Sequence, residues 1–152
     1  MTIRNDSYGS ADGVMALTRH LLDGAPKFSS LTRPTLGEVE RFIDRWSATL
    51  NVALINREVA VPVSDEIVRL TCEQWVIRQA AAEVELTQRG VGFSDVDDSR
   101  AAALRPGDLN SFADSVATAL RQMGVITTGR ASSGLSYTGT SVAMFTRGQF
   151  DL

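Results

Sequence analysis

The stretch that decides the fold is TLGEVERFIDRWSATLNVALINR, residues 35–57. Its large apolar side chains recur at alternating intervals of three and four residues, the period that places them on one face of an α-helix. Thr35 and Glu38 have the spacing of a capping box, in which two side chains satisfy free N–H groups at a helix start. The pattern predicts one helix over about residues 35–58, roughly 36 Å long. Its apolar face comprises Leu36, Val39, Ile43, Trp46, Leu50 and Ala53.

A second long helix is predicted after Pro62. Ser64 is the expected N-cap, and Asp65 and Glu66 follow in the first turn, where the helix dipole favours acidic side chains. Gly90 is the expected end of this helix. Because only a short loop separates the two long helices, we expect them to pack as an antiparallel pair. The apolar stripe of the second helix comprises Val68, Cys72, Trp75, Gln79, Ala82 and Leu86.

Shorter helices are predicted on either side of this pair. The first begins with Ser10 as its N-cap and ends at Gly24. A short helical piece precedes Pro106, and a last helix runs from its cap at Asp108 to Gly124. The sequence therefore predicts an all-α domain over residues 1–124, a small bundle of about four helices whose two central helices are long and antiparallel.

The remaining residues, 125–152, do not continue the helical pattern. They are rich in Gly, Ser and Thr, and two extended runs flank Thr138 and Gly139, a pair that favours a hairpin turn. Their apolar content is too high for a freely solvated tail. We therefore predict an extended C-terminal arm that becomes ordered on a partner by adding strands or wrapping a neighbour. A disordered terminus is the alternative.

Composition limits the functional classes. The net charge of −3 gives no general attraction for nucleic acid, and the single cysteine allows no intrachain disulfide. No apolar run reaches the length of a membrane span, and the first residues lack a signal-peptide core. We expect a soluble protein that is made in the cytoplasm.

The sequence contains no recognisable motif for catalysis or metal binding. His20 is the only histidine, and Cys72 lies inside an apolar stripe, where a free cysteine behaves as a small buried apolar residue. Asp95, Asp97 and Asp98 lack the spacing of a calcium-binding loop. The chain has no phosphate-binding loop or dinucleotide fingerprint. The residues predict a protein that is not an enzyme and has no cofactor or metal; an enzyme of unfamiliar type is the alternative.

Three segments carry a resemblance: YGSADGVMALTRHL (residues 8–21), FSSLTRPTLGEVERFIDRWSATLNVAL (28–54) and PVSDEIVRLTCEQWVIRQAAAEVEL (62–86). Together they resemble the head–tail adaptor proteins of long-tailed phages, also called head–tail connector or head-completion proteins. The most telling element is TRPTLGEV, which leads into the first long helix. The resemblance covers roughly residues 8–123 and leaves the last residues of the chain uncovered.

The resemblance implies a structural virion protein without catalytic activity. Such adaptors form a ring, typically twelvefold, below the portal protein at the head–tail interface. They extend the channel through which DNA passes without specific binding, and they present a surface to a tail terminator or stopper protein. The particle would be a phage or a phage-derived gene transfer agent, and the protein would be made in the bacterial cytoplasm. The alternative is a small cytoplasmic helical module that binds one protein, such as a regulator or an antitoxin-like partner.

Two sets of candidate site residues follow from this reading. The arm would bind the portal or a neighbouring subunit through Arg130, Leu135, Tyr137, Met144, Phe145, Arg147 and Phe150. Charge pairs between subunits would set their register more than they would add affinity. The candidates for such subunit contacts are Arg41, Arg45, Arg69 and Arg78 together with Asp65, Glu66 and Glu73.

Overall fold

The computed structural model describes residues 3–22, 24–88 and 99–125 of the chain. This part is all-helical and contains no strand, so the predicted all-α class is confirmed. It has four main helices, the short helix α4 and one 3-10 turn, η1. The elements are α1 (Ala11–Thr18), η1 (Arg19–Leu21), α2 (Leu36–Ile55), α3 (Glu66–Gln88), α4 (Ser99–Leu104) and α5 (Leu109–Gln122). The predicted arm and its turn at Thr138 and Gly139 lie outside the described residues.

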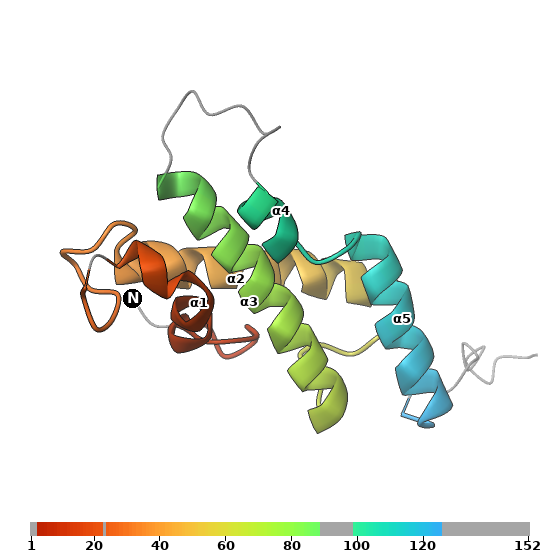
Figure 1. Ribbon diagram of the computed structural model, residues 1–152. Helices are drawn as coiled ribbons and strands as arrows, with labels where there is room; N and C mark the ends of the chain where they lie inside the picture. Colours follow the sequence, from red (N-terminus) through yellow and green to blue (C-terminus); the bar gives the residue numbers. More distant parts are fainter. Residues whose placement is uncertain (1–2, 23, 89–98, 126–152) are drawn as a thin grey trace, which may run out of the picture.

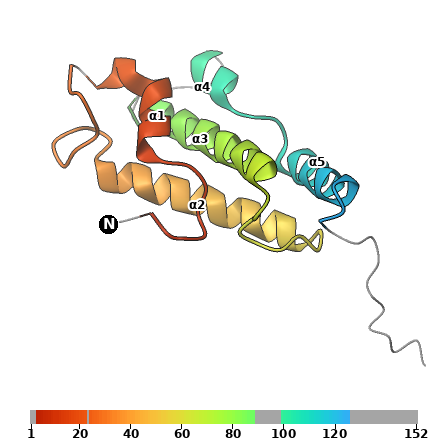
Figure 2. The same cartoon turned by 90° about the horizontal axis from the view of Figure 1, so that it is seen from below.

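Helix α3 is the central element of the bundle. It contacts α1, α2, α4 and α5, and it runs back across α2 obliquely, in a roughly antiparallel sense, as the short connection predicts (Figures 1 and 2). The small side chains of Ala80, Ala81 and Ala82 are buried, which lets neighbouring helices approach α3 on several sides. Within the described ranges, no helix is both long and apolar enough to cross a membrane.

Three aromatic side chains join α2, α3 and α5. Trp75 is 3% exposed and meets Trp46 edge to face, with ring centroids 6.0 Å apart. On its other side Trp75 stacks on Phe112, with centroids 5.5 Å apart and an interplanar angle of 18°. Both arrangements are favoured by the ring quadrupole. The two tryptophans that the sequence placed on helix stripes therefore form the contact between the long helices.

The helix starts follow the predicted caps with one exception. Ser10 and Asp108 each accept a hydrogen bond from the third residue of their helix, and the Glu38 carboxylate accepts from the Thr35 N–H at 2.7 Å. In α3 the cap is Asp65 and not Ser64, since Asp65 Oδ1 accepts from the Val68 N–H at 3.0 Å. A helix that begins at Glu66 places Val68 within reach of the residue at 65.

The first helix is shorter than predicted. The α-helix ends at Thr18 and continues as the 3-10 turn η1, while Gly24 adopts the expected left-handed conformation with φ +83°. The Thr18 hydroxyl donates to the Val14 carbonyl at 2.9 Å. Thr49 and Thr71 make the same one-turn contact inside α2 and α3, so this hydrogen bond by itself does not end α1.

The residues before α1 form part of the core. Tyr8 is fully buried, its N–H donates to Ser47 Oγ at 2.9 Å, and its hydroxyl accepts from the Val63 N–H at 3.0 Å. Asn51 Nδ2 donates to the Asp6 carbonyl at 3.0 Å. Burial raises the pKa of the Tyr8 hydroxyl above its ordinary value. The N-terminal segment is thus fastened to α2 and to the loop between the long helices.

Helix α5 is held to the end of α2 through Arg57. Arg57 Nε lies 2.5 Å from Asp114 Oδ1, and its guanidinium also donates to the carbonyls of Ala53 and Asn110. Arg121 donates in return to the Arg57 carbonyl at 3.4 Å. These contacts fix the side of the bundle on which α5 lies, and with it the shape of the surface between α5 and α3.

Candidate functional site

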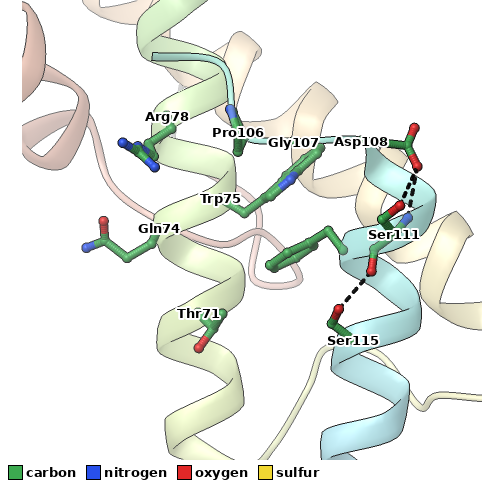
Figure 3. A pocket seen from close by; sticks show the side chains of 10 residues that line it. Thr71, Gln74, Trp75, Arg78, Pro106, Gly107, Asp108, Ser111 and Ser115 are labelled. Carbon is green, nitrogen blue, oxygen red and sulfur yellow. Dashed lines mark hydrogen bonds between the residues drawn. The ribbon is translucent and has the colours of Figure 1, made fainter. Parts of the chain in front are cut away.

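A groove of about 390 Å³ lies between α3 and α5. Figure 3 shows α3 supplying one wall and α5 the other, with the connection at Pro106 and Gly107 above them. Its inner wall is apolar, because Trp75 and Phe112 stack there, while Arg78 and Asp108 carry charge at its edge. The residues that line it are Thr71, Gln74, Trp75, Arg78, Pro106, Gly107, Asp108, Ser111, Phe112 and Ser115.

One polar atom of the groove has no hydrogen bond. Trp75 Nε1 is buried without a partner among the described residues, and the indole edge that carries it points toward Pro106 and Gly107 (Figure 3). A buried N–H left unpaired costs about 1–3 kcal/mol relative to its solvated state. Such groups are few in folded proteins and require an explanation. By contrast, Trp46 Nε1 donates to Glu83 Oε2 at 2.9 Å.

A buried carboxylate joins η1, α3 and α4. Glu85 is 1% exposed, and its Oε1 lies 2.9 Å from His20 Nε2 and 3.2 Å from Arg100 Nε. An acid beside an imidazole can transfer protons, but this acid is closed off from a substrate by its burial. Neither Glu85 oxygen has a hydrogen bond of good geometry among the described residues, so His20 and Arg100 compensate the buried acid only as close ion-pair partners, which favours a structural role that joins the three elements. Among the described residues, no group of acidic, His and Cys side chains is arranged to hold a metal ion.

A second candidate surface is apolar. Eight large apolar side chains are exposed among the described residues, and six of them belong to the last turn of α2, the first turns of α3 and the end of α5. These three helix ends lie on the same side of the molecule, and Val125 borders the loop between α2 and α3 (Figure 1). We call these six exposed residues at the three helix ends the apolar end: Val52, Ile55, Ile67, Leu70, Met123 and Val125.

Several of the predicted contact residues have partners within the chain. Arg45 forms an ion pair with Glu83 and lies 5.6 Å from the centre of the Phe42 ring. Arg69 Nε lies 3.5 Å from Glu73 Oε1, one helical turn away. These pairs are exposed or half-exposed, and such pairs add little to stability. Their role between subunits stays a prediction.

Of the other predicted charged residues, two bond backbone groups in the first turns of helices and two are exposed on the surface. Asp65 caps α3, and Arg41 Nε donates to the Gly37 carbonyl at 3.2 Å. Glu66 is exposed in the first turn of α3, and Arg78 lies at the edge of the groove. The residues predicted for the arm all lie outside the described part of the chain: Arg130, Leu135, Tyr137, Met144, Phe145, Arg147 and Phe150.

Cys72 has the environment that the sequence predicts. Its side chain is fully buried, and this burial raises the pKa of the thiol to about 12. Only the thiolate is an effective nucleophile or metal ligand. The thiol at this position is therefore an inert part of the core at neutral pH.

Comparison of the chain with protein-family models, with curated proteins and with solved structures finds no match. The candidate sites therefore rest on the geometry of the chain itself. Sequence patterns indicated Trp75 and Phe112 on apolar helix faces but not their stacking across α3 and α5. They gave no signal for the cluster around Glu85, because its three members are far apart in sequence.

Proposed function

We propose that this chain is a structural subunit of a ring that joins the DNA-filled head of a phage-type particle to its tail, without catalytic activity. The apolar end is the observation that carries the proposal. Exposed apolar side chains that gather on one side of a small domain mark contacts with other proteins. Scattered single apolar residues would carry no such meaning.

A ring requires two different surfaces on each copy, because a repeated head-to-tail contact closes only when one patch meets a different one on the next copy. The apolar end supplies one patch. The exposed charges of Glu66 and Arg78 supply groups that can set the register of a second patch. Residues 126–152 follow Val125, which belongs to the apolar end, so the arm starts where a neighbouring copy or a portal protein would be in contact.

The proposed partners are the portal protein, further copies of this chain in a twelvefold ring, and a tail terminator or stopper protein. DNA would pass through the ring without specific binding. The net charge of −3 supports this part of the proposal, because a wall along which DNA slides must not neutralise its phosphates. Tight binding of duplex DNA by the chain at physiological salt would contradict it.

The second candidate function is a small helical module that binds a single protein, as a regulator or an antitoxin-like partner does. The groove between α3 and α5 favours this candidate, because a hollow with an aromatic wall and a few polar groups suits one inserted side chain. This reading needs no ring and no portal protein.

Mixing the chain with the portal protein encoded in the same genome distinguishes the two functions. We expect native mass spectrometry and negative-stain images to show a ring of this chain seated on the portal ring. The chain alone is the control, since an adaptor can stay monomeric until it meets its portal. No association with the portal, together with a small complex with one soluble protein, would overturn the proposed function in favour of the binding module.

A further inference from the structure

We infer that the groove between α3 and α5 binds a segment of this chain's own residues 126–152, supplied by a neighbouring copy. Phe150 would lie against the rings of Trp75 and Phe112, and Asp151 would pair with Arg78. The groove and its ligand chemistry are independent of the proposed function; only the neighbouring copy as the source of the segment rests on it.

The groove has the size and the lining of a peptide site. Its volume of about 390 Å³ falls in the range of about 300–1,000 Å³ typical of ligand pockets. Phe112 stacks on the buried Trp75 and is itself only half-buried, so its ring offers apolar surface to a further ring. Ser111 and Ser115 line the opposite side and are exposed on α5. An aromatic side chain with its flanking backbone matches these features.

The unpaired indole N–H indicates a ligand with a hydrogen-bond acceptor. Trp75 Nε1 is buried beside Pro106 and Gly107 and has no acceptor among the described residues (Figure 3). A backbone carbonyl of a peptide that enters beside this connection would provide the acceptor. Gly107 in this connection is exposed, and a Cβ built on it meets no atom within 4 Å, so a bound peptide would not clash with a side chain at this position. The peptide would thus complete a polar contact that the groove alone leaves unmade.

Charge selects the segment. Arg78 lies at the edge of the groove and has no ion pair to a described residue. A ligand that carries an acidic group next to its aromatic side chain would therefore pair with Arg78. Asp151 is the only acidic residue in 126–152, and it directly follows Phe150. Neither Tyr137 nor Phe145 has an acidic neighbour in the sequence. Phe150 and Asp151 are therefore the pair that fits both the rings and Arg78.

The chain length allows this contact. Ser115 lies seven residues, or about 10 Å, before the end of α5 at Gln122, and Val125 follows three residues later. Residues 126–149 can span up to about 80 Å when extended. Phe150 can therefore reach a groove on an adjacent copy.

Photo-crosslinking of the full chain, alone and mixed with the portal protein, tests the inference. The photoreactive residue benzoylphenylalanine replaces Phe150, and the crosslinked sites are mapped by mass spectrometry. We expect crosslinks within residues 71–78 and 106–115, in a product of two-copy size on a denaturing gel. Ser115→Arg blocks the groove without removing a core side chain, and should lower the yield about tenfold. Thr118→Arg, on the exposed part of α5 outside the groove, is the matched control and should leave the yield unchanged.

Exchanging the charges of Arg78 and Asp151 distinguishes a direct ion pair from a general structural effect. Only a direct ion pair would be restored by the second substitution. Arg78→Glu should lower the crosslink yield, and Arg78→Glu together with Asp151→Arg should restore it. Crosslinks elsewhere, a product of one-copy size only, or a yield insensitive to both groove variants would overturn the inference. Rings on the portal without groove crosslinks would leave the proposed function intact. Groove crosslinks in a chain that never joins a portal would uphold the inference and remove the proposed function.

Discussion

At the scale of single residues, Cys72 couples stability to pH. Its thiol keeps its proton up to a pKa of about 12 in the folded chain, because it is buried, whereas an ordinary thiol loses it near 9.0. The folded state therefore binds more protons than the unfolded state above pH 9. We expect the free energy of unfolding to be unaffected by this group below that pH. Above it, the free energy should fall by about 1.4 kcal/mol per pH unit.

Urea denaturation at pH values of about 8, 9 and 10 measures this slope. Cys72→Ala is the control, since it removes the titrating group and should flatten the decline between the two higher values. Tyr8 has a raised pKa for the same reason, and its ordinary value of 10.0 means that it adds to the decline only at higher pH. An equally steep decline in Cys72→Ala would show that another group is responsible.

Gly9 is needed where the chain enters α1. Its φ is +91°, and a Cβ built on it would lie 2.8 Å from Ile77 Cγ1 on α3. We expect Gly9→Ala to destabilise the fold by about 1–3 kcal/mol, because it combines backbone strain with a steric clash. Gly37→Ala is the matched control. A Cβ there meets nothing within 4 Å, so Ala should stabilise α2 by up to about 1 kcal/mol. Thermal melts that move in the same direction for both variants would contradict this account.

At the scale of the helices, the contact between α2 and α3 depends unequally on its two tryptophans. Trp75 is 3% exposed and touches both α2 and α5, whereas Trp46 is half-buried at the edge of the contact. Trp75→Ala should cost about 3–5 kcal/mol, the range for a large buried side chain. Trp46→Ala should cost clearly less. Chemical denaturation measures the free energy of unfolding of both variants. Equal losses would contradict this account, because they would mean that Trp46 at the edge contributes as much as Trp75 at the centre.

Arg57 is a polar link between the end of α2 and α5, which also packs into the core through Val116 and Leu120, so Arg57 should influence local opening of α5. Arg57→Ala removes the contacts to Asp114, Asn110 and Ala53 together. We expect faster hydrogen exchange across Leu109–Gln122 and a lower melting temperature, with little change in α3. Asp114→Ala removes the ion pair alone and should have a smaller effect. Arg57 also lowers the pKa of Asp114, so its pairing is present at neutral pH and lost as pH falls through that lowered value.

At the scale of the whole molecule, the apolar end should govern association and not folding. Val52 and Ile67 are 59% and 69% exposed, so Val52→Asp with Ile67→Asp should leave the melting temperature nearly unchanged. The double variant should fail to form rings with the portal protein. Leu31→Asp is the control, since Leu31 is 92% exposed but does not belong to the apolar end. Rings formed as well by the double variant as by the control would exclude this surface from the contact between copies.

The local pattern of the sequence determined most of the helical elements. Apolar residues spaced three and four apart, and polar caps such as Asp108 and the pair Thr35 and Glu38, specify α2, α3 and α5, because helix hydrogen bonds and caps join residues close in sequence. The same pattern placed Trp75 and Cys72 in the core, whereas Trp46, which it also placed there, is half-buried at the edge. It misjudged the end of α1 at Thr18 and the cap of α3, where the Asp65 side chain and not Ser64 accepts the Val68 N–H.

Only the tertiary structure determined which side chains from different helices come into contact. Tyr8 is buried because α2 and the loop at Val63 close over it, and Glu85 is paired because η1 and α4 meet α3. The groove exists because α5 packs where Phe112 stacks on Trp75, a position that the Arg57 contacts and the buried side chains of α5 share in setting. Each of these contacts joins residues that are distant in sequence. The spacing of apolar residues within one helix does not indicate which face of another helix it will contact. The packing of the whole chain selects those pairs, since burial and charge pairing are satisfied together only in the folded arrangement.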